Sequence, residues 1–137
     1  MEAAAGSVER SGREFASATE SIGAARDLIR ESMASASVGE ETVGDVLLAI
    51  SELVTNAVVY GNGGPITVEI ESSSEAIVCS VASGYSGRPL PDPATWTSPG
   101  RAGPNGRGLA IVRAVADAVV VDIDDSTMTV RCTFVRR

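Results

Sequence analysis

Hydrophobic residues recur at helical spacing in two stretches near the N-terminus, at 19–35 and 40–60. In the first stretch the recurring positions are Ile22, Ala25, Ile29 and Met33. In the second stretch they are Val43, Leu47, Ile50, Val54 and Ala57. A spacing of three or four residues places such side chains on one face of a helix. The pattern predicts two helices, the first with Thr19 as its N-cap and the second ended by the glycine-rich cluster 61–64.

A period of two, or a short run of apolar residues bounded by turn residues, marks the expected strands. These segments are 12–18, 65–72, 75–82, 119–123 and 127–135. Ser73 and Ser74 connect two of these strands by a short polar turn, which predicts a hairpin. A third helix is predicted to begin at the glycine-flanked turn 106–108, with Leu109, Val112 and either Val115 or Ala116 on its apolar stripe.

The element order β-α-α-β-β-loop-α-β-β predicts an α+β fold with two layers. We expect a mixed, mostly antiparallel sheet with about three helices on one face. The 137 residues suffice for one domain, placed at 12–137 after a flexible tail at 1–11. The segment 83–105 is rich in Gly, Pro and Ser and is long for a loop, which is typical of a functional segment. Trp96 either packs this segment down or contacts a partner.

The composition limits the chemistry that the chain can perform. The formal net charge is -7, and all 11 basic residues are Arg, so neither Lys nor His is present. This excludes a Walker-type phosphate-binding lysine, a Schiff-base lysine and any Ser-His or Cys-His catalytic pair. The arginines are scattered, which disfavours direct binding of nucleic acid. An acidic protein of this kind is better suited to a basic surface on another protein.

The expected cellular location of the protein follows from two features that the sequence does not show. No uninterrupted apolar run reaches the roughly 18 residues of a membrane helix, and the N-terminus lacks the basic start and apolar core of a signal peptide. We therefore expect a cytoplasmic protein that does not contact a membrane. Cys79 and Cys132 lie in strand-like apolar runs without metal-ligand partners, which predicts reduced thiols in the core.

Glu52 and Asn56 are four residues apart on the second predicted helix, so they project from one side of it. A carboxylate and an amide one turn apart can serve as a general base and as an oxygen ligand for magnesium. Spacing alone favours the simpler interpretation of a solvated polar helix face. The neighbouring Ser51 and Thr55 fit that simpler interpretation as well.

Gly106, Arg107 and Gly108 form a second candidate site at the start of the third predicted helix. A helix N-terminus offers unpaired N–H groups and the positive end of the helix dipole, and glycines allow a phosphate to approach the backbone. The alternative is that Asn105 and Gly106 only end a loop and cap a helix. The motif by itself does not decide between these two interpretations.

The order and spacing of several motifs resemble the GHKL ATPase superfamily, which includes gyrase, histidine kinases and MutL. The segments in question are SELVTNAVVYGNG, a strand hairpin, SGYSG, a long loop and GRGLAIVRAVAD. Within the superfamily, the chain most resembles the short anti-sigma-factor serine kinases, over about residues 12–135. The resemblance implies a protein that binds a sigma factor and uses Mg-ATP to phosphorylate a serine on a small antagonist protein of the STAS type. It also allows a homodimer, because family members pair.

The resemblance carries roles over to individual residues. Glu52 would be the general base, and Asn56 would hold Mg²⁺ against the phosphates of ATP. The phosphates would contact Gly106, Arg107 and Gly108, with residues 91–105 as a lid. Thr129, Ser83 and Gly87 would lie at the adenine end of the site.

The chain departs from the family at Ser83, which stands where the family motif Asp-x-Gly-x-Gly has its aspartate. A shift of the register by one residue would place Ala82 there instead. Tyr85 replaces the middle glycine. A serine keeps one hydrogen bond to adenine but loses the charge-assisted strength of a carboxylate, about tenfold in affinity.

Three hypotheses about function therefore stay open. The first is an active anti-sigma-factor serine kinase, favoured by Glu52, Asn56 and the glycines of 106–108. The second is a pseudokinase-like module that sequesters a regulatory protein without nucleotide, favoured by the missing aspartate. The third is a detached catalytic domain of a histidine kinase, disfavoured because the chain has no His and no dimerisation helices.

Overall fold

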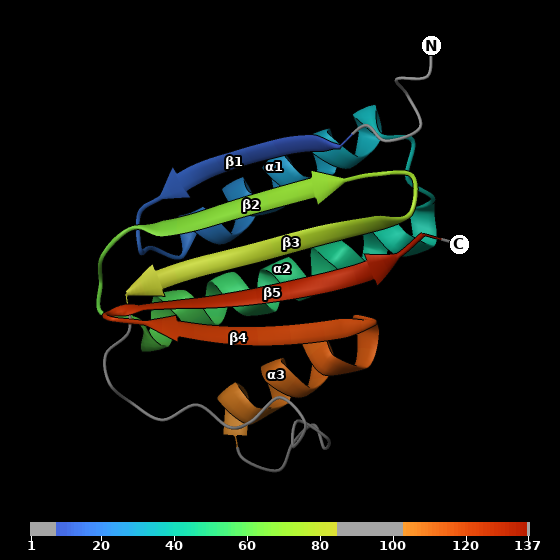
Figure 1. The fold of residues 1–137 in the computed structure, drawn as a ribbon. Coiled ribbons are helices and arrows are strands. Elements are labelled where there is room, and N and C mark those ends of the chain that lie inside the picture. The colour runs from blue at the N-terminus through green and yellow to red at the C-terminus, as the bar shows by residue number, and fades with distance from the viewer. Residues whose placement is uncertain (1–7, 85–102, 137) are drawn as a thin grey trace.

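The computed structural model describes residues 8–84 and 103–136, and for 103–108 it describes the backbone alone. Within these ranges the chain forms five strands and three helices (Figure 1). In chain order they are β1 (Glu9–Phe15), α1 (Glu20–Ser35), α2 (Glu40–Tyr60), β2 (Ile66–Ser72), β3 (Ala76–Gly84), α3 (Gly103–Val115), β4 (Ala118–Asp124) and β5 (Thr127–Val135). The predicted α+β fold and element order are confirmed.

The strands form one sheet in the order β1-β2-β3-β5-β4. Every pairing in it is antiparallel, so the parallel pair that a mixed sheet would contain is absent from the described strands. The hairpin of β2 and β3 is confirmed, with Ser72 opposite Ile77. β5 lies between β3 and β4, which places Cys132 directly opposite Cys79.

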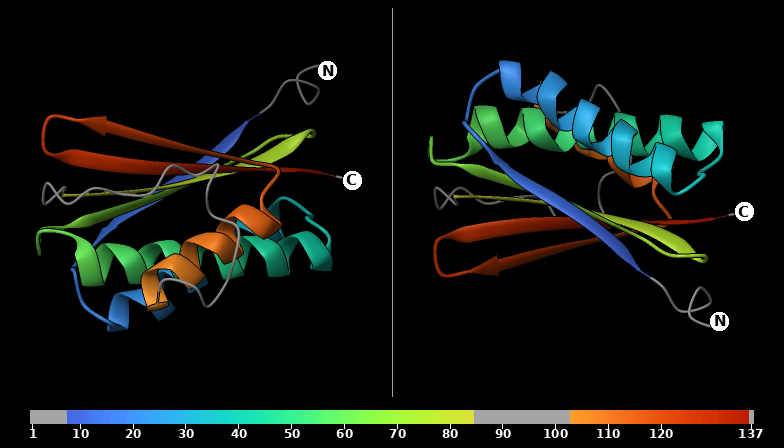
Figure 2. Two further views of the ribbon diagram at one scale, coloured as in Figure 1. Left: turned by 90° about the horizontal axis from the view of Figure 1, so that it is seen from below. Right: turned by 90° about the horizontal axis from the view of Figure 1, so that it is seen from above.

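All three helices cover the same face of the sheet, and α2 lies between α1 and α3 (Figure 2). The alternation of burial along β3 explains why one face is covered. Ile77, Cys79, Val81 and Ser83 are buried, while the residues between them are half-exposed on the other face. Successive strand side chains point to opposite faces, so the buried set defines the side that meets the helices.

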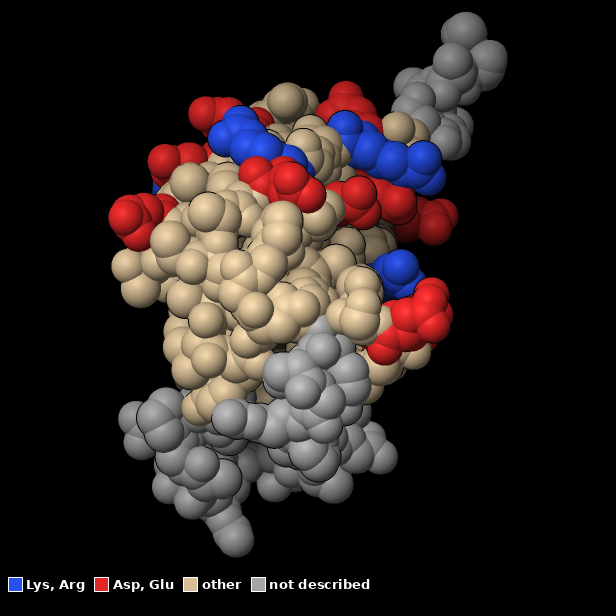
Figure 3. Space-filling view, turned by 90° about the vertical axis from the view of Figure 1, so that its left-hand side faces the viewer, with Lys and Arg blue, Asp and Glu red and all other residues tan. Residues whose placement is uncertain are grey.

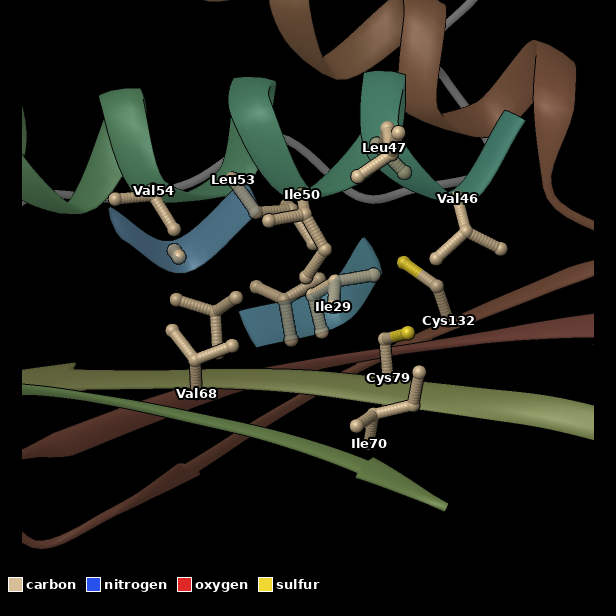
Figure 4. Close-up of a cluster of buried hydrophobic side chains, with 14 of the residues drawn as sticks. Ile29, Val46, Leu47, Ile50, Leu53, Val54, Val68, Ile70, Cys79 and Cys132 are labelled. Atoms are coloured by element: carbon tan, nitrogen blue, oxygen red, sulfur yellow. The ribbon is translucent and has the colours of Figure 1, made fainter. Parts of the chain in front are cut away.

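The core lies between α2 and the middle of the sheet (Figure 4). Val46, Ile50 and Val54 of α2 are fully buried there. Cys79 and Cys132 project from neighbouring strands into the same layer and are free thiols, as predicted. Burial raises the pKa of Cys132 to about 12 and raises the pKa of Cys79 as well, with a smaller contribution from the nearby Cys132. Both thiols therefore behave as small apolar groups.

By length and composition α2 is also apolar enough to cross a membrane. In this fold its apolar face packs on the sheet between the two other helices, which is the place of a core helix in a globular domain. Such a helix passes the same length test, so the finding is weak evidence for a membrane span.

Several predicted boundaries were wrong. β1 begins at Glu9 rather than at 12, so three residues of the expected tail pair with β2. The sequence of these three residues is polar and does not alternate as a strand does. They are in a strand because they pair with β2. Thr19 occupies the N-cap position, but it has helical backbone angles and makes no capping hydrogen bond. Its hydroxyl instead donates to Glu20 Oε1 at 3.5 Å.

Arg136 ties together the chain segments at the end of the molecule near the C-terminus. Its guanidinium donates to the carbonyl of Ser73 in the β2–β3 turn at 2.8 Å. It also donates to the carbonyls of Ala36 and Ser37, between α1 and α2, at 3.0 and 3.2 Å. One side chain thus joins the sheet to the helical layer at this end.

Candidate functional site

Three elements meet at the end of the molecule opposite Arg136. There α2 ends, β3 ends and α3 begins (Figures 1 and 2). The contact between the first two is close, because a Cβ at Gly84 would overlap the side chain of Asn62. A Cβ at Gly61 would lie 2.5 Å from the carbonyl oxygen of Ala57 and 3.5 Å from that of Gly84. Glycine at 61 and 84 lets the two ends pack this closely.

Asn56 lies near this end of α2, one turn before Tyr60. Its side-chain Nδ2 is buried and has no hydrogen-bond partner among the residues that the structure describes. A buried polar group without a partner costs about 1–3 kcal/mol. Native proteins keep few such groups, and those they keep commonly serve a ligand, an ion or an ordered water.

The hydroxyl side chains on this part of α2 have hydrogen-bond partners within the helix or on α1. Ser51 Oγ donates to the carbonyl of Leu47 at 2.9 Å, and Thr55 Oγ1 donates to the carbonyl of Ser51 at 2.6 Å. Arg26 of α1 in turn donates to Ser51 Oγ at 2.6 Å. The simpler interpretation of a solvated polar face therefore fits Ser51 and Thr55 but not Asn56.

Glu52 lies one turn before Asn56 on α2. Asn56 is roughly 140° around the helix axis from Ser51, at 100° per residue, and Ser51 marks the flank that contacts α1. The Glu52 side chain is half-buried, and neither an ion pair nor a hydrogen bond engages its carboxylate within 8–84 and 109–136. It is therefore free to accept a proton or a hydrogen bond from a ligand.

Ser83 is part of β3 rather than of the long loop in which the sequence had placed it. Its residue is 5% exposed and belongs to the buried, helix-facing set of the strand. The described residues offer its hydroxyl no hydrogen-bond partner. Ser83 precedes Gly84, which contacts the segment after α2, so it lies at the same end as Asn56.

Thr129 is not brought together with these residues. It pairs with Ala82 and with Asp122, on the face of the sheet that the helices leave uncovered. Its neighbour Met128 is opposite Ser83 and packs against the core on the helix side. The alternation of Met128 with the apolar Val130 was a signal in the sequence that could have identified this position.

The remaining predicted residues lie partly outside the described chain. α3 begins at Gly103, three residues before the predicted start, so Gly106 to Gly108 are inside its first two turns. Only the first four N–H groups of an α-helix lack an internal partner, which here extends to Gly106. The proposed phosphate contacts of Arg107 and Gly108 stay predictions. Gly87, Tyr85, Trp96 and the lid up to residue 102 lie outside the described residues.

Charged side chains are few among the described residues around the end of α2 (Figure 3). Residues 53–68, which include the end of α2 and the start of β2, contain no charged side chain. In the view of this end, uncharged residues form a broad surface and the charged ones gather along its upper part and one side. A phosphate ligand would therefore meet no like charge from residues 53–68, and Glu52 is the one acidic side chain of α2 within a turn of Asn56.

The described residues fit Mg-ATP at its phosphate end better than at its base end. The buried amide of Asn56 can turn its oxygen into the site as a Mg²⁺ ligand, because rotation exchanges the amide oxygen and nitrogen. Ser83 offers a hydroxyl but no charge. No cluster of three or more His, Cys, Asp or Glu that could hold a metal occurs in the described ranges, so phosphate oxygens and water would have to complete the coordination.

Comparison with known proteins supports the family assignment. None of the curated proteins matches the chain. The structure resembles that of the RsbU and RsbW domains of Rv1364c from Mycobacterium tuberculosis, with a TM-score of 0.71 and 19% sequence identity. The match covers 94% of this chain and 33% of the other, so the chain spans about one third of that protein, and it establishes a shared fold. A family model described as histidine kinase-like ATPase domain matches residues 15–134, from the end of β1 into β5. The chain therefore belongs to the family of histidine kinase-like ATPase domains.

Proposed function

We propose that this protein is a regulator of the anti-sigma-factor class that binds Mg-ATP where α2, β3 and α3 meet. The observation that carries the proposal is the buried, unpartnered Nδ2 of Asn56 beside a free Glu52 carboxylate. The family assignment supplies a nucleotide as the ligand that such a site would take. The orphaned amide costs stability in the free protein, and a bound ligand would offset that cost.

Asn56 and Glu52 of α2 would have different roles in the transfer of a phosphoryl group to a protein serine. Mg-ATP supplies the transferable phosphoryl group when it is bound. Asn56 would orient the metal–phosphate unit through its amide oxygen, and Glu52 would accept the proton of the attacking serine hydroxyl. The N–H groups at the start of α3 would stabilise negative charge on the phosphates. Positioning and charge stabilisation supply most of the catalysis in reactions of this type.

The partners belong to this proposal as well. The resemblance of SELVTNAVVYG and GRGLAIVRAVAD to anti-sigma-factor kinases supports a sigma factor as the protein that is held and a STAS-type antagonist as the phosphate acceptor. The negative net charge suits partners with basic surfaces rather than nucleic acid. The proposal also includes a cytoplasmic location and a homodimer, since members of the family that the chain resembles form pairs.

The first test is thermal unfolding with Mg-ATP, with Mg²⁺ alone and without either. Saturation at a hundredfold excess over Kd should stabilise the fold by about 2.7 kcal/mol. Asn56→Leu should abolish this shift, because it removes the amide while filling its volume. Thr55→Val is the matched control, since Thr55 bonds only within the helix. An absence of any shift at millimolar Mg-ATP would exclude the nucleotide site.

The second test concerns Glu52. Glu52→Gln should keep the affinity for Mg-ATP in a calorimetric titration and lose the transfer of labelled phosphate to a STAS-type antagonist from the same organism. Glu41→Gln, a substitution on the same helix far from the site, serves as the control for the lost charge. Undiminished transfer by Glu52→Gln would remove this residue from the role of base.

Ser83 favours a second candidate function, a module that sequesters its partner without nucleotide. A neutral hydroxyl at the base end weakens the nucleotide contact by about tenfold relative to a carboxylate. Pull-down of a sigma factor by the protein with and without Mg-ATP separates the two candidates. Equal capture in both conditions, together with no thermal shift, would favour the nucleotide-independent module.

A further inference from the structure

The segment 61–65, between α2 and β2, contains the dipeptide Asn62–Gly63, which has no role in the proposed function. Both residues are exposed, and a Cβ at Gly63 would meet no atom within 4 Å, so water can reach the dipeptide. Gly63 has a φ of 88°, which glycine adopts without strain. The segment belongs to neither a helix nor a strand, so its backbone can rotate without breaking a series of hydrogen bonds.

The hydrogen bonds around Asn62 favour attack on its side-chain amide by the backbone nitrogen of Gly63. The N–H of Gly64 donates to Asn62 Oδ1 at 2.9 Å, which folds the side chain over the following peptide and keeps Cγ close to the Gly63 nitrogen. The same N–H would stabilise the negative charge that develops on Oδ1 when a nucleophile adds to Cγ. Among the residues that the structure describes, none forms a hydrogen bond with the Gly63 N–H, so this nitrogen is available.

We propose that Asn62 is a site of spontaneous deamidation. The Gly63 nitrogen forms a bond to Asn62 Cγ, the bond between Cγ and Nδ2 breaks, and ammonia leaves with the proton of the Gly63 N–H. The product is a five-membered cyclic imide, which water opens. Addition of water at Cγ gives aspartate, whereas addition at the main-chain carbonyl gives isoaspartate, in which the chain runs through Cγ. The net reaction consumes one water, releases one ammonia and oxidises nothing.

The other Asn–Gly dipeptide of the sequence, Asn105–Gly106, allows a comparison within the same molecule. Its backbone lies in the first turn of α3. Closure of the imide requires the following nitrogen to rotate towards Cβ, and the ψ angle of an α-helix holds that nitrogen away. Deamidation at Asn105 would therefore require the start of α3 to unwind. We expect Asn62 to react much faster than Asn105 in the folded protein.

Deamidation would change the end of the molecule that carries the proposed site. Residues 53–68 contain no charged side chain, and both products add one carboxylate to them. The Asn62 side chain also occupies the space where a Cβ at Gly84 would lie, so isoaspartate would disturb the contact with the end of β3. The added charge should weaken binding of Mg-ATP by about two- to threefold at physiological ionic strength. This effect on the ligand rests on the proposed nucleotide site, whereas the deamidation does not.

The test is incubation of the full chain at neutral pH and physiological temperature in heavy-oxygen water, followed by peptide mass spectrometry. Position 62 should gain one heavy oxygen atom with time, as a mixture of aspartate and isoaspartate. Asn105, and Asn56 within α2, should remain amides over the same period. In denaturant, Asn62 and Asn105 should react at similar rates, because glycine follows both and the helix no longer protects Asn105.

Two variants identify the reacting residue. Asn62→Ser removes the amide but keeps an oxygen that can accept from Gly64, and it should accumulate no acidic form in isoelectric focusing. Asn105→Ser is the matched control and should accumulate the acidic form at the rate of the unaltered protein. Circular dichroism verifies that both variants fold, and the mass measurement on the unaltered protein does not depend on either of them.

The possible results separate this inference from the proposed function. An Asn62 amide that persists in the folded protein while the unfolded chain reacts would overturn the inference. Equal rates at Asn62 and Asn105 in the folded protein would contradict the role given to the fold. Calorimetric titration of Asn62→Asp and Asn62→Ser with Mg-ATP tests the effect on the ligand, and equal affinities would refute it. If neither variant nor the unaltered protein binds Mg-ATP, the proposed nucleotide site is wrong and the deamidation site stands.

Discussion

The layer between α2 and the sheet is built differently at its two ends. At the end near the C-terminus, Arg136 joins both layers through carbonyl hydrogen bonds, and the space beside it is filled by apolar side chains and the two thiols. At the opposite end, the Nδ2 of Asn56 is buried without a partner in the described chain, and the Ser83 hydroxyl makes no hydrogen bond there. At the first end the guanidinium of Arg136 has hydrogen-bond partners within the chain, and we call it the satisfied end. At the other end, the unsatisfied end, polar groups lack such partners.

The difference suggests that one end of this small domain contributes mainly to its stability and the other end mainly to ligand binding. The satisfied end supplies the free energy that keeps the layers together. The unsatisfied end lowers the stability of the free protein, and it does so where a ligand could supply the missing hydrogen bonds. Departures from complete hydrogen bonding are expected at functional sites, where function rather than stability explains them.

Ile50→Ala tests the satisfied part of the layer and should have the largest effect. Ile50 is fully buried on α2, so its truncation leaves a cavity and should lower the free energy of unfolding by about 3–4 kcal/mol. Leu48→Ala, on the same helix but 39% exposed, should cost less than about 1 kcal/mol. Denaturant titrations would measure both, and similar losses would show that the core does not lie where the structure has it.

The second largest effect should come from alkaline pH, which should lower the free energy of unfolding through the two buried thiols. Unfolded thiols ionise near pH 8.5, whereas burial holds the pKa of Cys132 at about 12 and raises that of Cys79. Their contribution is therefore intact below pH ~8.5 and declines as the pH rises, by about 3 kcal/mol for both thiols at pH ~9.5. The double variant Cys79→Ala/Cys132→Ala should lose this part of the pH dependence, and retention of it would assign the decline to other groups.

Arg136→Met should have a smaller effect at the satisfied end. It removes the guanidinium that donates to Ser73, Ala36 and Ser37, and we expect a loss of about 2 kcal/mol in the free energy of unfolding. Arg131→Met is the control, because Arg131 is exposed on β5 and should be nearly neutral. Equal melting temperatures for the two variants would refute a joining role for Arg136.

Asn56→Leu should have the smallest effect on stability and sharpens the comparison most. Replacing an unpartnered buried amide by an apolar group of similar size should leave the free energy of unfolding within about 1 kcal/mol of the unaltered protein, or raise it. Thermal unfolding without ligand would measure this. A loss of 2 kcal/mol or more would mean that the amide already has a structural partner, and the two ends would then not differ as described.

The sequence determined the elements whose signals are local. The period of α2 and the glycines after it fixed both ends of that helix, because a helix forms its hydrogen bonds within one segment. The β2–β3 hairpin was readable for the same reason, since its turn joins neighbouring strands. Glu52 and Asn56 could be paired from spacing alone, although spacing could not show that the Nδ2 of Asn56 is buried without a partner.

Tertiary structure decided what depends on segments far apart in the chain. The first residues of β1 become a strand only because β2 lies beside them. The pairing of β3 with β5 gives Ser83 a strand position opposite Met128 and turns Thr129 to the other face. Burial without a hydrogen-bond partner, the property that marks the Nδ2 of Asn56, arises when layers pack, because only then is water removed from a polar group.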